Sequence, residues 1–304
     1  TYRSQRRGGR GVQGASSREE DFVEHLFVAN THSYILFFTD KGKCYWVKVY
    51  DIPEGGRAAK GRAIVNLIGC EPDEKVSAFI SVKEFNEDHY VVMATEKGMV
   101  KKTKLSAYSN PRKKGIYAVE IRDGDKLIEA RVSTGDNDIL LGTRNGKSIR
   151  FSEEQIRASG RKTMGVKGIA LSSEDDRLVG MLLIKREGTV LVATEKGFGK
   201  RTEISQYRAQ KRGGKGVLTM KTTDKVGKMV TIKEVVDKDD LMIITNQGVL
   251  IRLPVAQIRS IGRATQGVKL IKLGEGTLVS SITRIMSEEE EDENNNTEST
   301  ETKE

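Results

Sequence analysis

The sequence predicts an all-β, propeller-like fold built from repeated units of about 50 residues. A Thr-x-x-Gly turn returns five times between apolar runs, with its glycine at Gly42, Gly98, Gly146, Gly197 and Gly248. A loop that ends in glycine before a short apolar strand follows each turn, and a further apolar run follows each loop. Glycine is abundant (31) and proline is scarce (4). This balance is typical of tight turns between short strands rather than of long helices.

Each element of the unit has a physical reason. The turn glycine supplies the positive φ that a tight hairpin needs, so each turn is expected to join two antiparallel strands. The second loop ends 17 or 19 residues later, at Gly61, Gly115, Gly165, Gly216 and Gly267. The last apolar runs fall at 74–82, 125–132, 176–184, 226–235 and 275–285. A unit therefore has about four strands, and such units pack as the blades of a ring.

The two ends of the chain depart from this pattern. A further loop, Gly11-Val12, has no Thr-x-x-Gly turn before it, and we expect the missing hairpin upstream of Thr1. The last residues include nine acidic residues and one lysine, a composition typical of disorder, and their role is either regulatory or solubilising. We therefore expect a half-blade at 1–31, blades at 32–85, 86–135, 136–186, 187–238 and 239–287, and a disordered acidic tail at 288–304.

Composition excludes several classes of function. Residues 1–287 carry a net charge of +17, which attracts polyanions. No apolar run is long enough to span a bilayer and no basic amphipathic helix is evident, so nucleic acid is favoured over a membrane. Cys44 and Cys70 follow no metal spacing, and the three histidines are scattered. The stretch 142–148 resembles a phosphate-binding loop but has one residue too few between its glycines. No catalytic, cofactor or metal site is predicted.

Basic residues instead recur at fixed positions of the repeat. Around the second loop they are Arg57, Lys60, Arg62, Arg112, Lys113, Lys114, Arg161, Lys162, Lys167, Lys211, Arg212, Lys215, Arg263 and Lys269. After the hairpin turn they are Lys43, Lys48, Lys101, Lys102, Lys104, Lys147, Arg150, Lys200, Arg201 and Arg252. A charge repeated in register makes a continuous belt, and duplex DNA presents one phosphate charge per ~1.7 Å of axis. The belt predicts binding of double-stranded DNA through its backbone and bendability.

The densest basic segment is Gln5-Arg6-Arg7-Gly8-Gly9-Arg10-Gly11, and a degenerate copy stands at 210–216. It resembles the seven-residue box, Gln-Arg-Arg-Gly-Gly-Lys-Gly, that marks the C-terminal domain of DNA gyrase A proteins, with Arg10 in place of lysine. The stretches 21–32 and 262–268 also resemble that family, and the resemblance covers roughly residues 4–286.

The resemblance implies a six-bladed β-pinwheel, incomplete here at its first blade, in which neighbouring blades exchange strands. It implies that DNA winds round the rim, so that the parent ATP-dependent type IIA topoisomerase introduces negative supercoils. The box, Gln5 to Gly11, is implied to direct this wrap. The implied partners are the rest of gyrase A and the gyrase B protein in an A2B2 complex, in the bacterial cytoplasm at the nucleoid. The cleaving tyrosine and the ATP and Mg sites are implied to lie elsewhere, so this fragment needs no cofactor.

Two alternatives remain. The equivalent C-terminal domain of topoisomerase IV generally has a degenerate box, whereas this box is nearly intact. A propeller-type scaffold for RNA or protein would show Gly-His and Trp-Asp repeats, but Trp46 is the only tryptophan. Single-stranded nucleic acid needs exposed stacking aromatics, and aromatic residues make up 6% of the chain.

Overall fold

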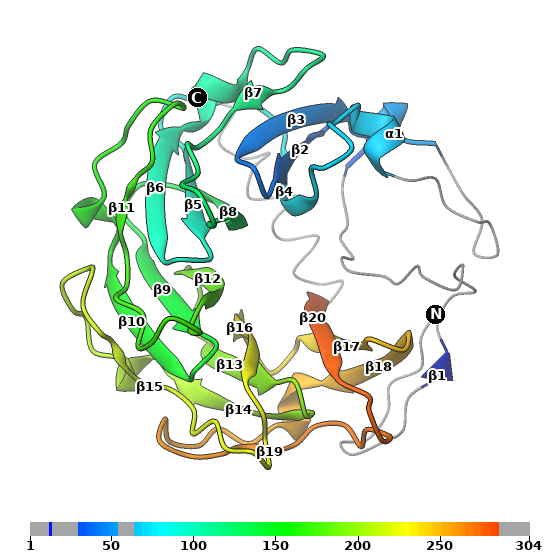
Figure 1. Cartoon of the computed structure of the whole chain (residues 1–304), viewed down its shortest axis with the longest axis vertical. Coiled ribbons are helices and arrows are strands. Elements are labelled where there is room, and N and C mark those ends of the chain that lie inside the picture. Colours follow the sequence, from blue (N-terminus) through cyan, green and yellow to red (C-terminus); the bar gives the residue numbers. More distant parts are fainter. Residues whose placement is uncertain (1–11, 14–29, 54–63, 286–304) are drawn as a thin grey trace, which may run out of the picture.

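The computed structural model describes residues 12–13, 30–53 and 64–285, with side chains from residue 30 onward. These residues form five antiparallel four-stranded sheets arranged round a common centre, as in a propeller (Figure 1). The all-β, propeller-like prediction is confirmed. The half-blade predicted at 1–31 and the tail at 288–304 lie almost entirely outside the described residues.

The first two sheets are formed by residues 34–167. The first contains β4 (Val76–Val82), β2 (Tyr34–Thr39), β3 (Lys43–Lys48) and β7 (Ile116–Tyr117), in that order. The second contains β8 (Leu127–Ser133), β5 (Tyr90–Thr95), β6 (Met99–Lys104) and β11 (Val166–Lys167). In each sheet the first strand lies toward the centre of the ring and the last at its outer edge (Figure 1).

The other three sheets repeat this order. The third contains β12 (Leu178–Ile184), β9 (Asp138–Thr143), β10 (Lys147–Ser152) and β15 (Val217–Leu218). The fourth contains β16 (Met229–Val235), β13 (Thr189–Thr194), β14 (Phe198–Glu203) and β19 (Val268–Lys269). The fifth contains β20 (Val279–Ile285), β17 (Asp240–Thr245), β18 (Val249–Pro254) and β1 (Val12–Gln13). The apolar runs predicted between 74 and 285 are therefore the inner strands.

Helical structure in residues 30–53 and 64–285 is confined to short, single-turn elements. A 3₁₀ helix follows the second strand of each hairpin: η1 (Val49–Asp51), η2 (Leu105–Tyr108), η3 (Glu153–Gln155), η4 (Ile204–Gln206) and η5 (Val255–Gln257). The one α-helix of the described residues, α1 (Ile64–Ile68), was not anticipated from the sequence. No helix within the described ranges is long and apolar enough to cross a membrane.

The Thr-x-x-Gly turns form the hairpins, and their glycines adopt the positive φ that the sequence predicts. Gly146, for example, has φ +83°, and a Cβ there would lie 2.2 Å from the Met220 carbonyl oxygen. Its N–H donates to the Thr143 carbonyl (3.0 Å), and the Thr143 hydroxyl accepts the Lys147 N–H (3.3 Å). The threonine therefore caps the turn that the glycine permits. The phosphate-loop-like stretch 142–148 is this hairpin, with strands on both sides.

The outer strand of each sheet comes from the next repeat, so neighbouring blades exchange strands as the resemblance implied. β7 follows the second hairpin along the chain but pairs with β3 of the first. β1 pairs with β18 in the same way, with Val12 opposite Leu250. This register matches that of β15 on β10, where Val217 lies opposite Ser148, since each partner stands two residues after its turn glycine. The N-terminal strand thus joins the last sheet by the rule that links the other sheets.

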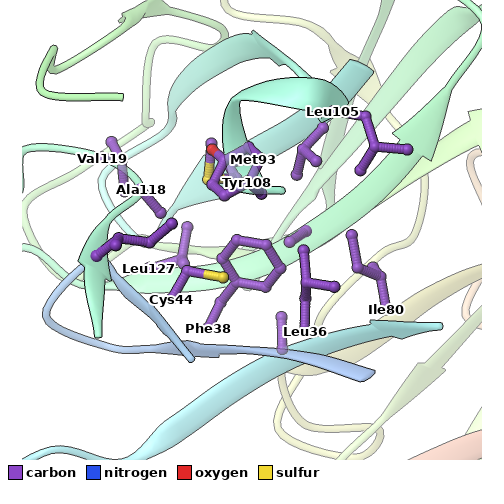
Figure 2. Close-up of a cluster of buried hydrophobic side chains, with 14 of the residues drawn as sticks. Leu36, Phe38, Cys44, Ile80, Met93, Leu105, Tyr108, Ala118, Val119 and Leu127 are labelled. Carbon is purple, nitrogen blue, oxygen red and sulfur yellow. The ribbon is translucent and has the colours of Figure 1, made fainter. Parts of the chain in front are cut away.

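The core lies between consecutive sheets. Leu36, Phe38 and Cys44 of the first sheet meet Met93 and Leu127 of the second in one buried cluster (Figure 2). Equivalent clusters join the second sheet to the third, the third to the fourth and the fourth to the fifth. Each buried aliphatic or aromatic side chain contributes about 1.5–3 kcal/mol. Sheets that are marginal alone are therefore stabilised by stacking.

The two cysteines show no metal or redox arrangement. Cys44 is buried in the first cluster, where burial raises the pKa of its thiol, and Cys70 is half-buried. Over the part of the chain that the structure describes, no group of three or more His, Cys, Asp or Glu side chains could hold a metal ion.

Candidate nucleic-acid interface

Besides β1, four segments of the chain form the described outer edge of the ring. They comprise residues 108–117, 156–167, 207–218 and 258–269, and each runs from the end of a 3₁₀ helix to the exchanged outer strand (Figure 1). We call them the rim segments. Together they contain fourteen lysines and arginines and no aspartate or glutamate. Repetition of the same segment therefore places only positive formal charge along this edge.

Most rim cations face solvent. Eleven are exposed: Arg112, Lys113, Lys114, Arg157, Lys162, Lys167, Arg208, Lys211, Lys215, Arg259 and Lys269. The other three, Arg161, Arg212 and Arg263, are half-buried. Among the described residues, none of the fourteen forms an ion pair with a carboxylate. Their charge is therefore not neutralised locally.

Three of these exposed arginines were not predicted from the sequence. Arg157, Arg208 and Arg259 each stand eleven residues after the turn glycine, in the pattern Gln-Ile/Tyr-Arg. The residue before each arginine is buried, with exposed fractions of at most 2%. The residue after Arg208, Ala209, bridges to Arg150 of the preceding hairpin. The backbone of Arg208 is therefore held on both sides while its side chain is exposed. The constant offset and the preceding glutamine were the available sequence signal.

The degenerate box at 210–216 is an ordered part of the rim. The Arg212 Nε donates to the Gln155 carbonyl (3.0 Å) and its Nη1 to the Lys167 carbonyl (3.1 Å). The Gln155 side chain in turn accepts the Arg212 N–H (2.9 Å) and donates to the Gln210 carbonyl (3.3 Å). Gly213 has φ +79°, and its N–H donates to the Gly168 carbonyl (2.6 Å). Arg212 therefore fixes the loop to the neighbouring repeat, while Lys211 and Lys215 face solvent.

Other half-buried rim arginines also bind main-chain oxygens. The Arg263 Nη1 donates to the Leu218 carbonyl (2.9 Å), and its guanidinium lies over the Tyr207 ring. The Arg161 Nη1 donates to the Tyr117 carbonyl (3.4 Å), and the Lys162 ammonium lies over the Tyr117 ring. These contacts link one rim segment to the next without neutralising the charge.

Two cations predicted to lie on the belt are in the interior. Lys101 and Lys200 have exposed fractions of 1% and 0%. Burial, followed by the charge of Arg161, lowers the pKa of Lys101 to about 8. Burial, followed by the charge of Arg263, lowers the pKa of Lys200 to about 8. The expectation that these two side chains lie on the basic edge was wrong, because both donate to carbonyl groups inside the protein.

The cations one residue further along the same strand, four residues after the turn glycine, also lie wholly or partly inside the protein. Lys102 and Arg201 are buried, and Arg150 and Arg252 are half-buried. Each pairs with a carboxylate: Lys102 with Glu153 (3.4 Å), Arg150 with Asp138 (2.6 Å), Arg201 with Asp237, and Arg252 with Asp240 (2.6 Å). Their recurrence in the sequence reflects structural ion pairs, which the second hairpin strand forms with the first strand, with a 3₁₀ helix or with a loop. These four cations are therefore not on the exposed belt.

The remaining predicted positions are mixed. Lys43 pairs with the buried Glu74 (2.9 Å), and a hydrogen bond to Glu74 raises the pKa of Lys43. Lys48 is half-buried beside the rings of Tyr34 and Tyr50. Lys104 is exposed and pairs with Glu87 (3.2 Å), and Lys147 is half-buried. The predicted positions Gln5 to Gly11, Arg57, Lys60 and Arg62 lie outside the described residues.

Fold and edge together define a β-propeller domain with a basic rim. The sequence profile of the family described as "DNA gyrase C-terminal domain, beta-propeller" matches residues 1–30, 33–83, 89–134, 137–185, 188–235 and 239–285. The chain belongs to this family, and the resemblance inferred from the box is confirmed.

Curated relatives agree with this membership. The chain is 47% identical over 292 residues to the DNA gyrase A protein of Staphylococcus epidermidis (strain ATCC 12228 / FDA PCI 1200), covering 95% of this chain and 33% of that protein. It is 46% identical over 305 residues to the DNA gyrase A protein of Staphylococcus aureus (strain NCTC 8325 / PS 47), covering 99% and 34%. The chain thus spans about a third of the length of these relatives.

Solved structures share the fold. A structure titled "Structure of DNA gyrase A C-terminal domain" superposes with a TM-score of 0.81 at 23% identity, over 94% of this chain and 93% of that one. The C-terminal domain of a DNA topoisomerase IV superposes with a TM-score of 0.79 at 25% identity, over 91% and 86%. Both gyrase and topoisomerase IV domains therefore use this arrangement of sheets.

Proposed function

We propose that this domain binds duplex DNA along the rim segments and bends it round the ring. The observation that carries the proposal is the set of four acid-free basic segments, placed at the same position of successive repeats. Phosphate contacts provide affinity without sequence information, and a curved basic edge rewards DNA that can bend. Family membership supports the same role, since DNA wrapping is the known role of this family.

The proposed contact set differs from the one expected from the sequence. It includes the eleven exposed rim cations, among them Arg157, Arg208 and Arg259. It leaves out Lys101, Lys102, Lys200 and Arg201, because their side chains are buried and bind groups within the protein. Lysine and arginine on backbone-anchored loops are suited to phosphate contact. Exposed aromatic side chains for base stacking are few on the described rim, where Tyr117 is 53% exposed.

We further propose the six-bladed pinwheel and the directing role of the box at Gln5 to Gly11. The family profile matches six stretches, the first at residues 1–30, which supports six repeats. The box matches the ordered segment 210–216 position by position, with basic residues at the same three places. β1 follows the box and pairs with β18 in the register that β15 adopts on β10. The boundaries proposed for the blades, 32–85, 86–135, 136–186, 187–238 and 239–287, are those of the sequence repeats, since the outer strands β7, β11, β15 and β19 each pair with the preceding sheet.

Within the longer relatives, this domain would serve an ATP-dependent topoisomerase. We propose that it acts with the rest of gyrase A and with the gyrase B protein, in the bacterial cytoplasm at the nucleoid. It presents a wrapped DNA segment, and the partner regions supply the cleaving tyrosine, ATP and Mg. The alternative, a topoisomerase IV C-terminal domain, shares the fold. Identities of 46–47% to gyrase A proteins over nearly the whole chain favour the gyrase assignment.

Ligation of nicked circular DNA on the domain tests the proposal. If DNA wraps round the rim, closing the nick traps a linking-number change whose size grows with the ratio of domain to DNA. Absence of a linking-number change at saturating occupancy would refute wrapping.

Substitution of the box tests its separate role. Changing Arg6, Arg7 and Arg10 to alanine is expected to abolish the linking-number change more strongly than it weakens binding. An equal loss of binding and wrapping would show that the box is one phosphate contact site among others.

A further inference from the structure

We propose that Lys200 and Lys101 are positioning residues, which set the path of bound DNA by holding rim segments in place without touching DNA. The inference rests on the proposed function, since it concerns the shape of the wrapping surface. Each lysine stands three residues after a turn glycine, on the second strand of a hairpin. Each reaches from its own sheet to the rim segment of the following repeat.

The contacts of Lys200 are with the last rim segment. Its Nζ donates to the carbonyl oxygens of Gly262 (2.6 Å) and Arg263, and to the Thr265 hydroxyl (3.1 Å). The Thr265 hydroxyl also donates to the Gly262 carbonyl (3.0 Å). One ammonium thus gathers the middle of segment 258–269 against β14. The exposed Arg259 and Lys269 lie on either side of this anchor in the sequence.

Lys101 makes the equivalent link two repeats earlier. Its Nζ donates to the Arg161 carbonyl (2.6 Å) in segment 156–167 and to the Ala118 carbonyl (2.7 Å). Ala118 directly follows segment 108–117. Lys101 therefore joins segment 156–167, and the residue that directly follows segment 108–117, to one point in the second sheet.

Core packing alone does not require a lysine at this position. The same place in the other three repeats is occupied by Tyr45, Ile149 and Ile251. Ile149 and Ile251 are buried, with exposed fractions of 0% and 1%, so an apolar side chain fits this site in the fold. Burying an ammonium is costly unless its donors are satisfied. The lysine in these two repeats is explained by its hydrogen bonds to main-chain carbonyls of the rim, because an isoleucine side chain has no donor for them.

The substitution Lys200→Ile separates positioning from contact. Because the neighbouring repeats carry isoleucine here, the variant is expected to fold. Amide hydrogen exchange in 258–269 should accelerate at least tenfold, while exchange in β13 stays unchanged. The linking-number change per bound domain should fall by half or more. The slope of log K against log salt should stay within about 0.3 of the parent value, since no phosphate contact is lost.

Lys211→Ala is the matched control, because it also removes one positive charge but from the exposed rim. It should lower the salt slope by about 0.9, as expected for the loss of one phosphate contact. Lys101→Ile, measured in parallel with exchange in 156–167, applies the same test to an independent segment.

Two results overturn the inference. One is an unchanged linking-number shift in both isoleucine variants. The other is a salt slope that falls by about 0.9 in either of them, since that would make the lysine a phosphate contact. Failure of the proposed function is distinguishable from both, because then the parent domain itself would trap no linking-number change.

Discussion

Removal of Lys211 and Lys215 tests the rim as a phosphate-binding edge. Both side chains are exposed, and within the described residues neither forms an ion pair with a carboxylate. If each lysine contacts one phosphate, each makes the slope of log K against log salt about 0.9 more negative. Relative to 1 M salt, this slope corresponds to about a 5-fold gain in affinity per lysine at 0.15 M salt. The double alanine variant should therefore bind about 30-fold more weakly at 0.15 M salt, a loss of about 2 kcal/mol.

The measurement is a salt titration of binding to a duplex, with the fold checked by thermal melting. If all eleven exposed rim cations contact phosphates, together they contribute a slope of about −10. The slope of the double variant should be about 1.8 less negative than that of the parent. Lys225→Ala with Lys272→Ala is the matched control. It removes the same charge from exposed loops outside the rim segments, so it should leave the slope nearly unchanged. Equal effects of both double variants would refute a localised rim and indicate attraction by net charge alone.

Three further predictions follow from the same structure. Gly216→Ala should destabilise the fold by about 2 kcal/mol or more, because φ is +69° and a Cβ would lie 2.3 Å from the Ser148 carbonyl oxygen. Gly262→Ala should change the melting temperature little, because the nearest atom to a Cβ there is the Gln206 Oε1, at an ordinary contact distance of 3.9 Å. The pKa of Lys200 is about 8 in the folded state, below its ordinary value of 10.5. Since the unfolded chain then binds more protons, this group makes the free energy of unfolding rise between pH 8 and 10.5, by at most about 3 kcal/mol. Denaturant titrations at both pH values should show this rise in the parent relative to Lys200→Ile, and identical pH profiles would contradict it. Removing residues 288–304 should tighten DNA binding if the acidic tail competes for the rim, whereas unchanged affinity would leave it a solubilising tail.

The strands and turns could be predicted because their signals are local. A glycine at positive φ and a threonine cap act within four residues, so Thr143 to Gly146 predicts its hairpin. The inner strands were visible as apolar runs after each second loop. The pairing of each outer strand was implied only by the family resemblance. The residues themselves do not predict it, because the paired residues of β7 and β3 are more than 70 positions apart and β7 has only two residues.

The candidate site was harder to predict, because a recurring cation carries the same sequence signal whether it faces water or carbonyl groups. Lys200 and Lys211 both recur in register, yet one is buried and the other exposed. What distinguishes them is the rim segment of the following repeat, which covers the second strand of the preceding hairpin. Burial of Lys200 is thus a consequence of strand exchange between repeats. Arg208 is the reverse case, an exposed rim cation that was not predicted. It stands before the glycine-rich loop, and that loop carries the stronger sequence signal.

Strand exchange also explains which groups the internal cations bind. Each rim segment lies against the hairpin of the preceding repeat, so side chains of that hairpin are placed to hold it. Arg150 donates to the carbonyls of Ile204 (3.3 Å) and Tyr207 (3.2 Å), just before segment 207–218 and at its first residue. Bending a short DNA site costs about 1–6 kcal/mol, and that stress must be resisted by the surface that imposes the bend. Mobile rim loops would deform to fit straight DNA, whereas loops fixed to a stacked sheet keep their positions and can force the DNA to bend round the ring. We therefore propose that the buried cations hold the exposed rim cations on a fixed curve, along which the DNA is bent.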